Sequence, residues 1–95
     1  MQFAPKHLDI NQIQERIMLE PGIKNVHHMH LWQLNDKDIH LDGHLDFEDD
    51  VSLSRASITI QQISDILDRE FNIKHTLLKP EFGVHDIKHL VVDER

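Results

Sequence analysis

Hydrophobic residues recur at intervals of three or four in two stretches of the chain, and each stretch predicts an amphipathic helix. The first helix is predicted to begin after Asp9, a suitable N-cap, and to end at Glu20-Pro21-Gly22; its apolar positions are Ile10, Ile13 and Ile17. The second helix is longer and is predicted to begin after Ser52 and to end at Asn72. Its single apolar stripe consists of Leu53, Ala56, Ile60, Ile63, Leu67 and Phe71.

Alternation of apolar and polar residues predicts strands in other parts of the chain. Residues 39–48 alternate almost without fault, which is the clearest strand signal present. Residues 23–33 are rich in β-branched, aromatic and His residues, and the turn-forming residues 35–38 separate these two runs. A short third strand is predicted at residues 73–79, and Pro80 either ends it or marks it as a sheet edge.

The predicted order, αββαβ, indicates an α+β fold, a ferredoxin-like sandwich with a small sheet and two helices on one face. The other face of such a sheet is left uncovered. The length predicts a single domain over residues 1–95, with its core in residues 5–82. Residues 83–95 are expected to form a tail, and a flexible one.

The charge of the chain limits the partners that it can have. Its formal net charge is −7, and no basic stretch follows the sequence, so we expect no nucleic acid partner. The chain contains no Cys, and a bound metal would therefore need imidazole and carboxylate ligands. No apolar run approaches the ~20 residues that cross a bilayer, so the chain as it stands is expected to be soluble.

Five of the nine histidines lie between residues 27 and 44, on the two strands of a predicted hairpin. On the second strand, the period of two places four polar side chains on the uncovered face: His40, Asp42, His44 and Asp46. The register of the first strand depends on the turn. A three-residue loop would pair His28 with His44 and His30 with Asp42, whereas a two-residue loop would place His30 opposite Leu41.

This concentration of imidazole and carboxylate suits Zn²⁺ or a neighbouring divalent transition ion, provided that ligands converge from adjacent strands. A single His on a solvated sheet face is more often a polar surface residue. The sequence has no zinc-finger or HExxH spacing that would fix a ligand set. It also has no nucleophile with a base, no phosphate-binding Gly loop and no dinucleotide fingerprint, so we predict that it is not an enzyme.

Residues 21–32 read PGIKNVHHMHLW, and this stretch resembles the cytosolic C-terminal domain of the cation diffusion facilitator transporters. The usual pattern there is PG-V-x-x-VHDLH-[IV]-W. The resemblance continues, in order, through Gly43-His44-Leu45, the long helix after Ser52 and the strand HTLLKPE at residues 75–81, where the family has an H-x-T-[IL]-Q-x-E-like strand. It covers about residues 5–82.

The resemblance implies a regulatory domain that lies on the cytoplasmic side of a membrane, with the transmembrane part of the transporter absent from this chain. It implies a ferredoxin-like fold that forms a homodimer, and divalent transition metal ions, Zn²⁺ first among them, that favour the compact, active arrangement. The partners implied are a second copy, the metal and the transmembrane domain of the same full-length protein. The alternative that we consider is a stand-alone ferredoxin-like module that binds small molecules and carries incidental histidines.

The resemblance also implies metal ligands. His27 matches the first-strand ligand of the family and His44 the second-strand ligand, while Glu81 matches the terminal acidic position. His28 replaces the common Asp of the motif and is expected to add a ligand. The remaining candidates are His75 and Asp42.

Two substitutions weaken the usual family site, because Ser57 stands where the family helix often carries His, and Lys79 stands where some members have a ligand His. His30 and Trp32 match the motif directly and are expected to have a structural role. His85 and His89 are spaced for one helical face but lie in the tail. Since binding needs neutral imidazoles, we expect metal affinity to fall below about pH 6.5.

Overall fold

The structure is a computed structural model that describes residues 7–35 and 37–83. Its elements follow the predicted αββαβ order: α1 (Ile10–Met18), β1 (Ile23–Gln33), β2 (Ile39–Phe47), α2 (Leu53–Phe71) and β3 (His75–Glu81). The fold prediction is therefore confirmed. The predictions for Pro5, for Asp36 and for the tail beyond Gly83, with His85 and His89, concern residues outside the described part of the chain.

Both helices begin, and α2 ends, where the sequence predicted, whereas α1 ends at Met18, with Leu19 as its C-cap, just before the predicted stop at residues 20–22. Side chains cap the two N-termini. The Asp9 side chain accepts a hydrogen bond from the backbone N–H of Asn11 at 2.9 Å, and the Ser52 hydroxyl accepts one from that of Arg55 at 3.1 Å. Asn72 ends α2 in the left-handed conformation, with φ 60, which Asn tolerates better than most residues. These local signals fix the helix boundaries without help from the rest of the fold.

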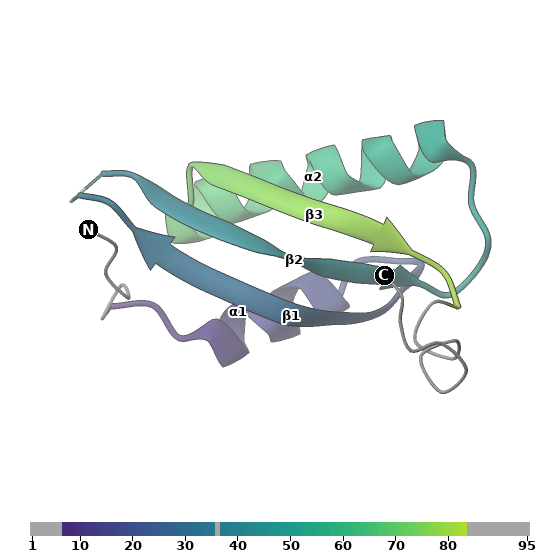
Figure 1. The fold of residues 1–95 in the computed structure, drawn as a ribbon, viewed down its shortest axis with the longest axis horizontal. Coiled ribbons are helices and arrows are strands. Elements are labelled where there is room, and N and C mark those ends of the chain that lie inside the picture. The colour runs from purple at the N-terminus through teal and green to yellow at the C-terminus, as the bar shows by residue number, and fades with distance from the viewer. Residues whose placement is uncertain (1–6, 36, 84–95) are drawn as a thin grey trace, which may run out of the picture.

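The three strands form one mixed sheet in the order β1-β2-β3. β1 and β2 pair antiparallel as a hairpin, and β2 and β3 pair parallel across the crossover made by α2. Figure 1 shows both helices behind the sheet, so that no helix of the described residues lies on the face toward the viewer. We call this face the helix-free face. Among the described helices, none is long and apolar enough to pass through a membrane.

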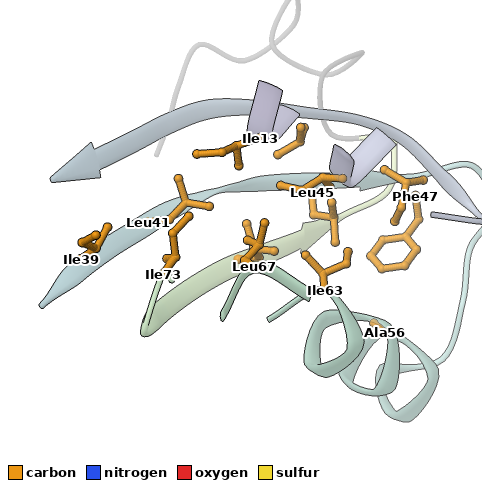
Figure 2. Packing of buried hydrophobic residues seen from close by; sticks show 13 residues of the cluster. Ile13, Ile39, Leu41, Leu45, Phe47, Ala56, Ile63, Leu67 and Ile73 are labelled. Carbon is orange, nitrogen blue, oxygen red and sulfur yellow. The ribbon is translucent and has the colours of Figure 1, made fainter. Parts of the chain in front are cut away.

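The hydrophobic core fills the space between the sheet and the two helices (Figure 2). β2 supplies the centre of the sheet side, and α1 and α2 supply the opposing layer. The side chains that are almost fully removed from solvent include Ile13, Ile17, Leu41, Leu45, Ile63 and Leu67. The core residues of β2 are odd-numbered, and the even-numbered side chains of this strand therefore lie on the helix-free face, as predicted.

β3 differs in its bounds from the prediction. It runs two residues later than expected and includes Pro80, which is tolerated because β3 is an edge strand that pairs only with β2. Ile73 does not open the strand, because its N–H closes the end of α2 on the carbonyl of Leu67 at 3.1 Å. Because the strand extends to Glu81, this residue pairs with Asp46 in the parallel register.

Candidate metal centre

A β-bulge in β1 sets the position of the first two imidazoles. His27 pairs with His44 and His30 pairs with Asp42, so β1 has two residues between these pairs where β2 has one. The bulge lies at His28, which has φ 54. The observed register agrees with each of the two alternatives in part. His30 pairs with Asp42, as the three-residue loop predicts. His27 pairs with His44, which is the pairing that follows from the two-residue loop.

Three imidazole rings converge on the helix-free face of the sheet as a result. The ring centroids of His27 and His44 are 5.2 Å apart, and the centroid of His28 lies 4.7 Å from that of His27 and 5.0 Å from that of His44. The Nδ1 atoms of His27 and His28 are 3.1 Å apart. All three rings are accessible from solvent to some degree, and His28 is the most exposed. A cation can therefore reach their nitrogen atoms.

Two carboxylates lie beneath these rings and are almost fully buried, since the side chains of Asp46 and Glu81 are each only 5% exposed. His27 Nε2 lies 3.4 Å from Asp46 Oδ1 and 3.3 Å from Glu81 Oε1. The other oxygen of Glu81 contacts His44 Nδ1 at 2.5 Å. We refer to these five residues as the His–carboxylate cluster: His27, His28, His44, Asp46 and Glu81.

The electrostatics of this cluster favour a cation. Two carboxylates that are buried side by side repel each other in a medium of low dielectric constant, and a bound divalent ion removes that repulsion. Within the described ranges, two groups of three side chains offer ligand atoms that all lie within 4.8 Å of one another: His27, His28 and His44, and His27, Asp46 and Glu81. Nitrogen and oxygen donors in such sets fit a divalent transition ion.

The structure brings together four of the six side chains that the sequence predicted as ligands, namely His27, His28, His44 and Glu81. It places Asp42 and His75 elsewhere on the sheet, with Asp42 opposite His30 and His75 opposite His40. Asp46 is in the cluster although the sequence did not single it out. The alternation of β2 already placed Asp46 on the helix-free face, together with Asp42. Choosing Asp46 over Asp42 as a ligand requires the register of β3, which puts Glu81 beside Asp46.

A second group of rings occupies the other end of the same sheet face. His30, Trp32, His40 and His75 form a row of stacked rings across all three strands, and we call this row the ring stack. Neighbouring centroids are 4.5, 5.1 and 4.2 Å apart, and the interplanar angles are 28°, 16° and 17°. Parallel rings present their faces to each other, so their nitrogen lone pairs do not point to a common centre.

One carboxylate accompanies the ring stack. Asp38 Oδ1 lies 3.6 Å from His75 Nε2, and Asp38 Oδ2 accepts a hydrogen bond from the Asn35 amide at 2.9 Å. The Asn35 hydrogen bond, which has the largest effect, and then the neighbouring His75 and His40 hold the pKa of Asp38 below its ordinary value, against the opposing effect of desolvation. Asp38 is exposed, in contrast to the two carboxylates of the cluster.

The two positions that depart from the family pattern do not add ligands. Lys79 on β3 pairs with His44 on β2. Its exposed side chain carries an ammonium group at the position where some relatives have an imidazole. Ser57 lies on α2, on the helix side of the fold, and its side chain is exposed. The cluster is therefore built from the three strands alone.

Comparison with known proteins identifies what this domain resembles. A family model described as "Cation efflux protein, cytoplasmic domain" matches residues 5–82. The proton-coupled zinc antiporter SLC30A1 of Rattus norvegicus is 29% identical over 92 residues, which are 97% of this chain and 17% of the antiporter. Zinc homeostasis factor 1 of Schizosaccharomyces pombe is 28% identical over 89 residues, or 92% of this chain and 22% of that protein. The chain thus spans about a fifth of the length of these relatives.

Solved structures with the same fold include a metal-bound form. The metal-bound C-terminal domain of the CzcD transporter from Cupriavidus metallidurans superimposes with a TM-score of 0.66 at 23% identity, covering 78% of this chain and 99% of that one. A variant of the MamM C-terminal domain gives a TM-score of 0.67 at 18% identity, covering 77% and 91%. At these identities the likeness establishes the fold.

Proposed function

Because the chain belongs to the family of cytoplasmic domains of cation efflux proteins, we propose that it is the metal-sensing, dimerising regulatory domain of a divalent cation efflux transporter. The family consists of transport proteins and not of enzymes, in agreement with the sequence prediction. The family match favours this proposal over a stand-alone small-molecule module. The short name of the matching family model, ZT_dimer, denotes a dimer and implies that its members dimerise.

The observation that carries the proposal is that His27 and His44 contact the buried carboxylates of Asp46 and Glu81, while His28 lies beside both rings. Burying two adjacent acidic groups costs stability unless positive charge accompanies them. A domain that maintains this arrangement at an accessible surface is suited to binding a cation, and to being more stable with the cation than without it.

We propose Zn²⁺ as the principal ion. Imidazole nitrogen with carboxylate oxygen is a common zinc ligand set, and the cluster contains both donors. Two relatives support this choice by their names, a zinc antiporter and a zinc homeostasis factor. When it is bound, the ion would supply positive charge that holds the rings of β1 and β2 and the carboxylates of β2 and β3 in one arrangement.

We propose further that the sensing step is a change in how two copies of the domain associate. Each copy has a formal net charge of −7, so two copies repel each other at low salt. The cluster lies on the face of the sheet that no helix covers, where a second copy can approach it. An ion shifts the association only as far as it binds one arrangement better than another. The transmembrane part of the full-length protein would receive this change.

The test is calorimetric titration of the metal-free domain with Zn²⁺, with sedimentation velocity on the same samples. His44→Ala is the test variant, and His40→Ala is the matched control because His40 lies on the same strand and face but belongs to the ring stack. We expect His44→Ala, but not His40→Ala, to weaken binding and the change in association. Binding that is indifferent to His44, or no binding at all, would contradict the proposal.

A further inference from the structure

His28 adopts a backbone conformation that its residue type disfavours. Apart from glycines, His28 and Asn72 are the two described residues with positive φ, and Asn72 has the clear local task of ending α2. His28 ends no helix, and its side chain is exposed, so packing does not explain the conformation. Positive φ is uncommon outside Gly, and Asn, Asp and His are the other residue types that adopt it most often. In a β-bulge such a residue directs its side chain to a particular place. Here that place is beside His27, with the two Nδ1 atoms 3.1 Å apart.

The ring of His27 has one nitrogen on each side of the cluster. Its Nδ1 faces His28, and its Nε2 faces Asp46 and Glu81 at 3.4 and 3.3 Å. We propose that His27 divides the cluster into two alternative cation positions, an imidazole position with His28 and His44 and a carboxylate position with Asp46 and Glu81. This inference rests on the proposed metal-binding function and specifies which ions the site accepts.

The two positions exclude each other because a neutral imidazole has only one nitrogen lone pair, the other nitrogen carrying a proton. If the lone pair is on Nδ1, His27 serves the imidazole position, and its Nε2–H can donate to the carboxylates. If the lone pair is on Nε2, His27 serves the carboxylate position. Each domain therefore holds one ion at His27 at a time.

The imidazole position is formed before an ion arrives. Two nitrogen ligands at the ~2.0–2.1 Å typical of zinc, with a tetrahedral angle between them, are about 3.3 Å apart. The Nδ1 atoms of His27 and His28 are 3.1 Å apart, a hydrogen-bond distance that is also close to this separation. An ion bound between them would displace the proton of this hydrogen bond. Glu81 accepts a hydrogen bond from His44 Nδ1, which leaves His44 Nε2 as the nitrogen with the lone pair. The carboxylates then orient the rings, as outer-shell acidic groups do for ligating histidines.

The division predicts selectivity between classes of ion. Ions that prefer imidazole, such as Zn²⁺ and Co²⁺, take the position that His28 completes, whereas Mn²⁺, which prefers oxygen donors, takes the carboxylate position. His28 is thus the residue that determines specificity toward late first-row ions. In the family motif this place is usually occupied by Asp, so the exchange to His changes the donor from oxygen to nitrogen.

The experiment titrates the wild-type domain, His28→Asn and His28→Gly with Co²⁺, followed by its visible absorption, and with Mn²⁺, followed by electron paramagnetic resonance. Asn keeps the tendency to left-handed backbone and Gly removes its cost, so neither variant is expected to disturb the bulge. His30→Asn is the matched control, because His30 lies on the same strand in the ring stack.

We expect both His28 variants to weaken Co²⁺ binding at least about tenfold and to alter its absorption bands, since one nitrogen ligand is lost, with Mn²⁺ affinity unchanged. His28→Gly is also expected to unfold at a higher temperature than the wild type without metal. With Co²⁺ and Mn²⁺ both in excess, one ion per cluster should be bound, because both compete for His27.

Three results separate the possible failures. Co²⁺ binding that is the same in the wild type and in both His28 variants would overturn this inference and leave the proposed function standing. Simultaneous binding of Co²⁺ and Mn²⁺ in one cluster would overturn the sharing of His27. A wild-type domain that binds neither ion would overturn the proposed function, and this inference with it.

Discussion

The two ends of the helix-free sheet face carry similar residues in different arrangements. The His–carboxylate cluster and the ring stack each contain three histidines, and each spans β1, β2 and β3. In the cluster the rings are tilted against one another by 46° to 76°, and two carboxylates with 5% exposed side chains lie against them. In the ring stack the planes are nearly parallel, and the carboxylate of Asp38 is 45% exposed.

The presence of three histidines is therefore not sufficient for a metal site. Tilted rings direct lone pairs toward a shared point, whereas stacked rings gain contact between their faces and direct their lone pairs apart. Buried carboxylates add a need for positive charge that exposed carboxylates, screened by water, do not have. The same residue types therefore serve binding at one end of the sheet and packing at the other.

The largest difference between the two ends is expected from removal of one imidazole at each. His27→Ala removes the ring that both groups of potential ligands share, and we expect Zn²⁺ affinity to fall by at least about 100-fold. His30→Ala, on the same strand, should leave the affinity unchanged. Calorimetric titration of both variants measures this directly, and a comparable loss in His30→Ala would remove the distinction between the ends.

A smaller effect is expected from the carboxylates of β2. At a Zn²⁺ concentration of about 100 times Kd, binding stabilises the wild type by about 2.7 kcal/mol. Asp46→Asn should reduce this by about 1.4 kcal/mol, if affinity falls about tenfold. Asp42→Asn should not reduce it, because Asp42 lies outside the cluster.

Thermal unfolding with and without Zn²⁺ checks this, since 1 kcal/mol shifts the Tm of a domain of this size by about 4–8 °C. The quantity to compare is the shift that Zn²⁺ causes in each variant, because either substitution can also change the metal-free Tm. Equal shifts in Asp46→Asn and in the wild type would show that burial of this carboxylate is unrelated to the ion.

A weaker effect, in the opposite direction, is expected from adding a carboxylate near the ring stack. Leu77 is 74% exposed and pairs with Asp42, as Glu81 pairs with Asp46. Leu77→Glu should therefore create a second, weaker Zn²⁺ binding phase that involves Asp42 and His30. Leu77→Gln is the matched control without charge. If calorimetry detects no second phase, two carboxylates on paired residues are insufficient to create a Zn²⁺ site, and the tilt of the imidazole rings is also required.

The smallest effect concerns Asp38 and acid stability. Its pKa is held below the ordinary value, first by the Asn35 hydrogen bond and then by His75. A lowered folded-state pKa contributes stability that is present above the unfolded-state pKa and is lost as pH falls through the folded-state pKa. Asp38→Asn should therefore lose less stability than the wild type below about pH 4. Urea unfolding at pH 7 and at lower pH tests this, and equal losses would contradict it.

Parts of this structure that depend on local chemistry were predictable from the sequence. The N-caps Asp9 and Ser52, the end of α2 at Asn72 and the alternation of β2 follow from side chains that act on their neighbours. The bulge at His28 was not predicted, because the register of a hairpin depends on its turn. Its one signal was Gly43, the β2 residue opposite the bulge, where a Cβ would lie 3.3 Å from Met29. The inclusion of Asp46 depends on the register of β3, a contact across the whole of α2.

The separation of the cluster residues along the chain gives the site an order of assembly. His27 and Asp46 are 19 residues apart and meet in the β1–β2 hairpin, whereas His44 and Glu81 are 37 residues apart and meet only after β3 has paired. Contacts between distant residues form later in folding, and synthesis also releases the N-terminal segment first. We therefore expect the three imidazoles to come together before Glu81 joins them. A newly made chain would reach its full metal affinity only when β3 pairs with β2.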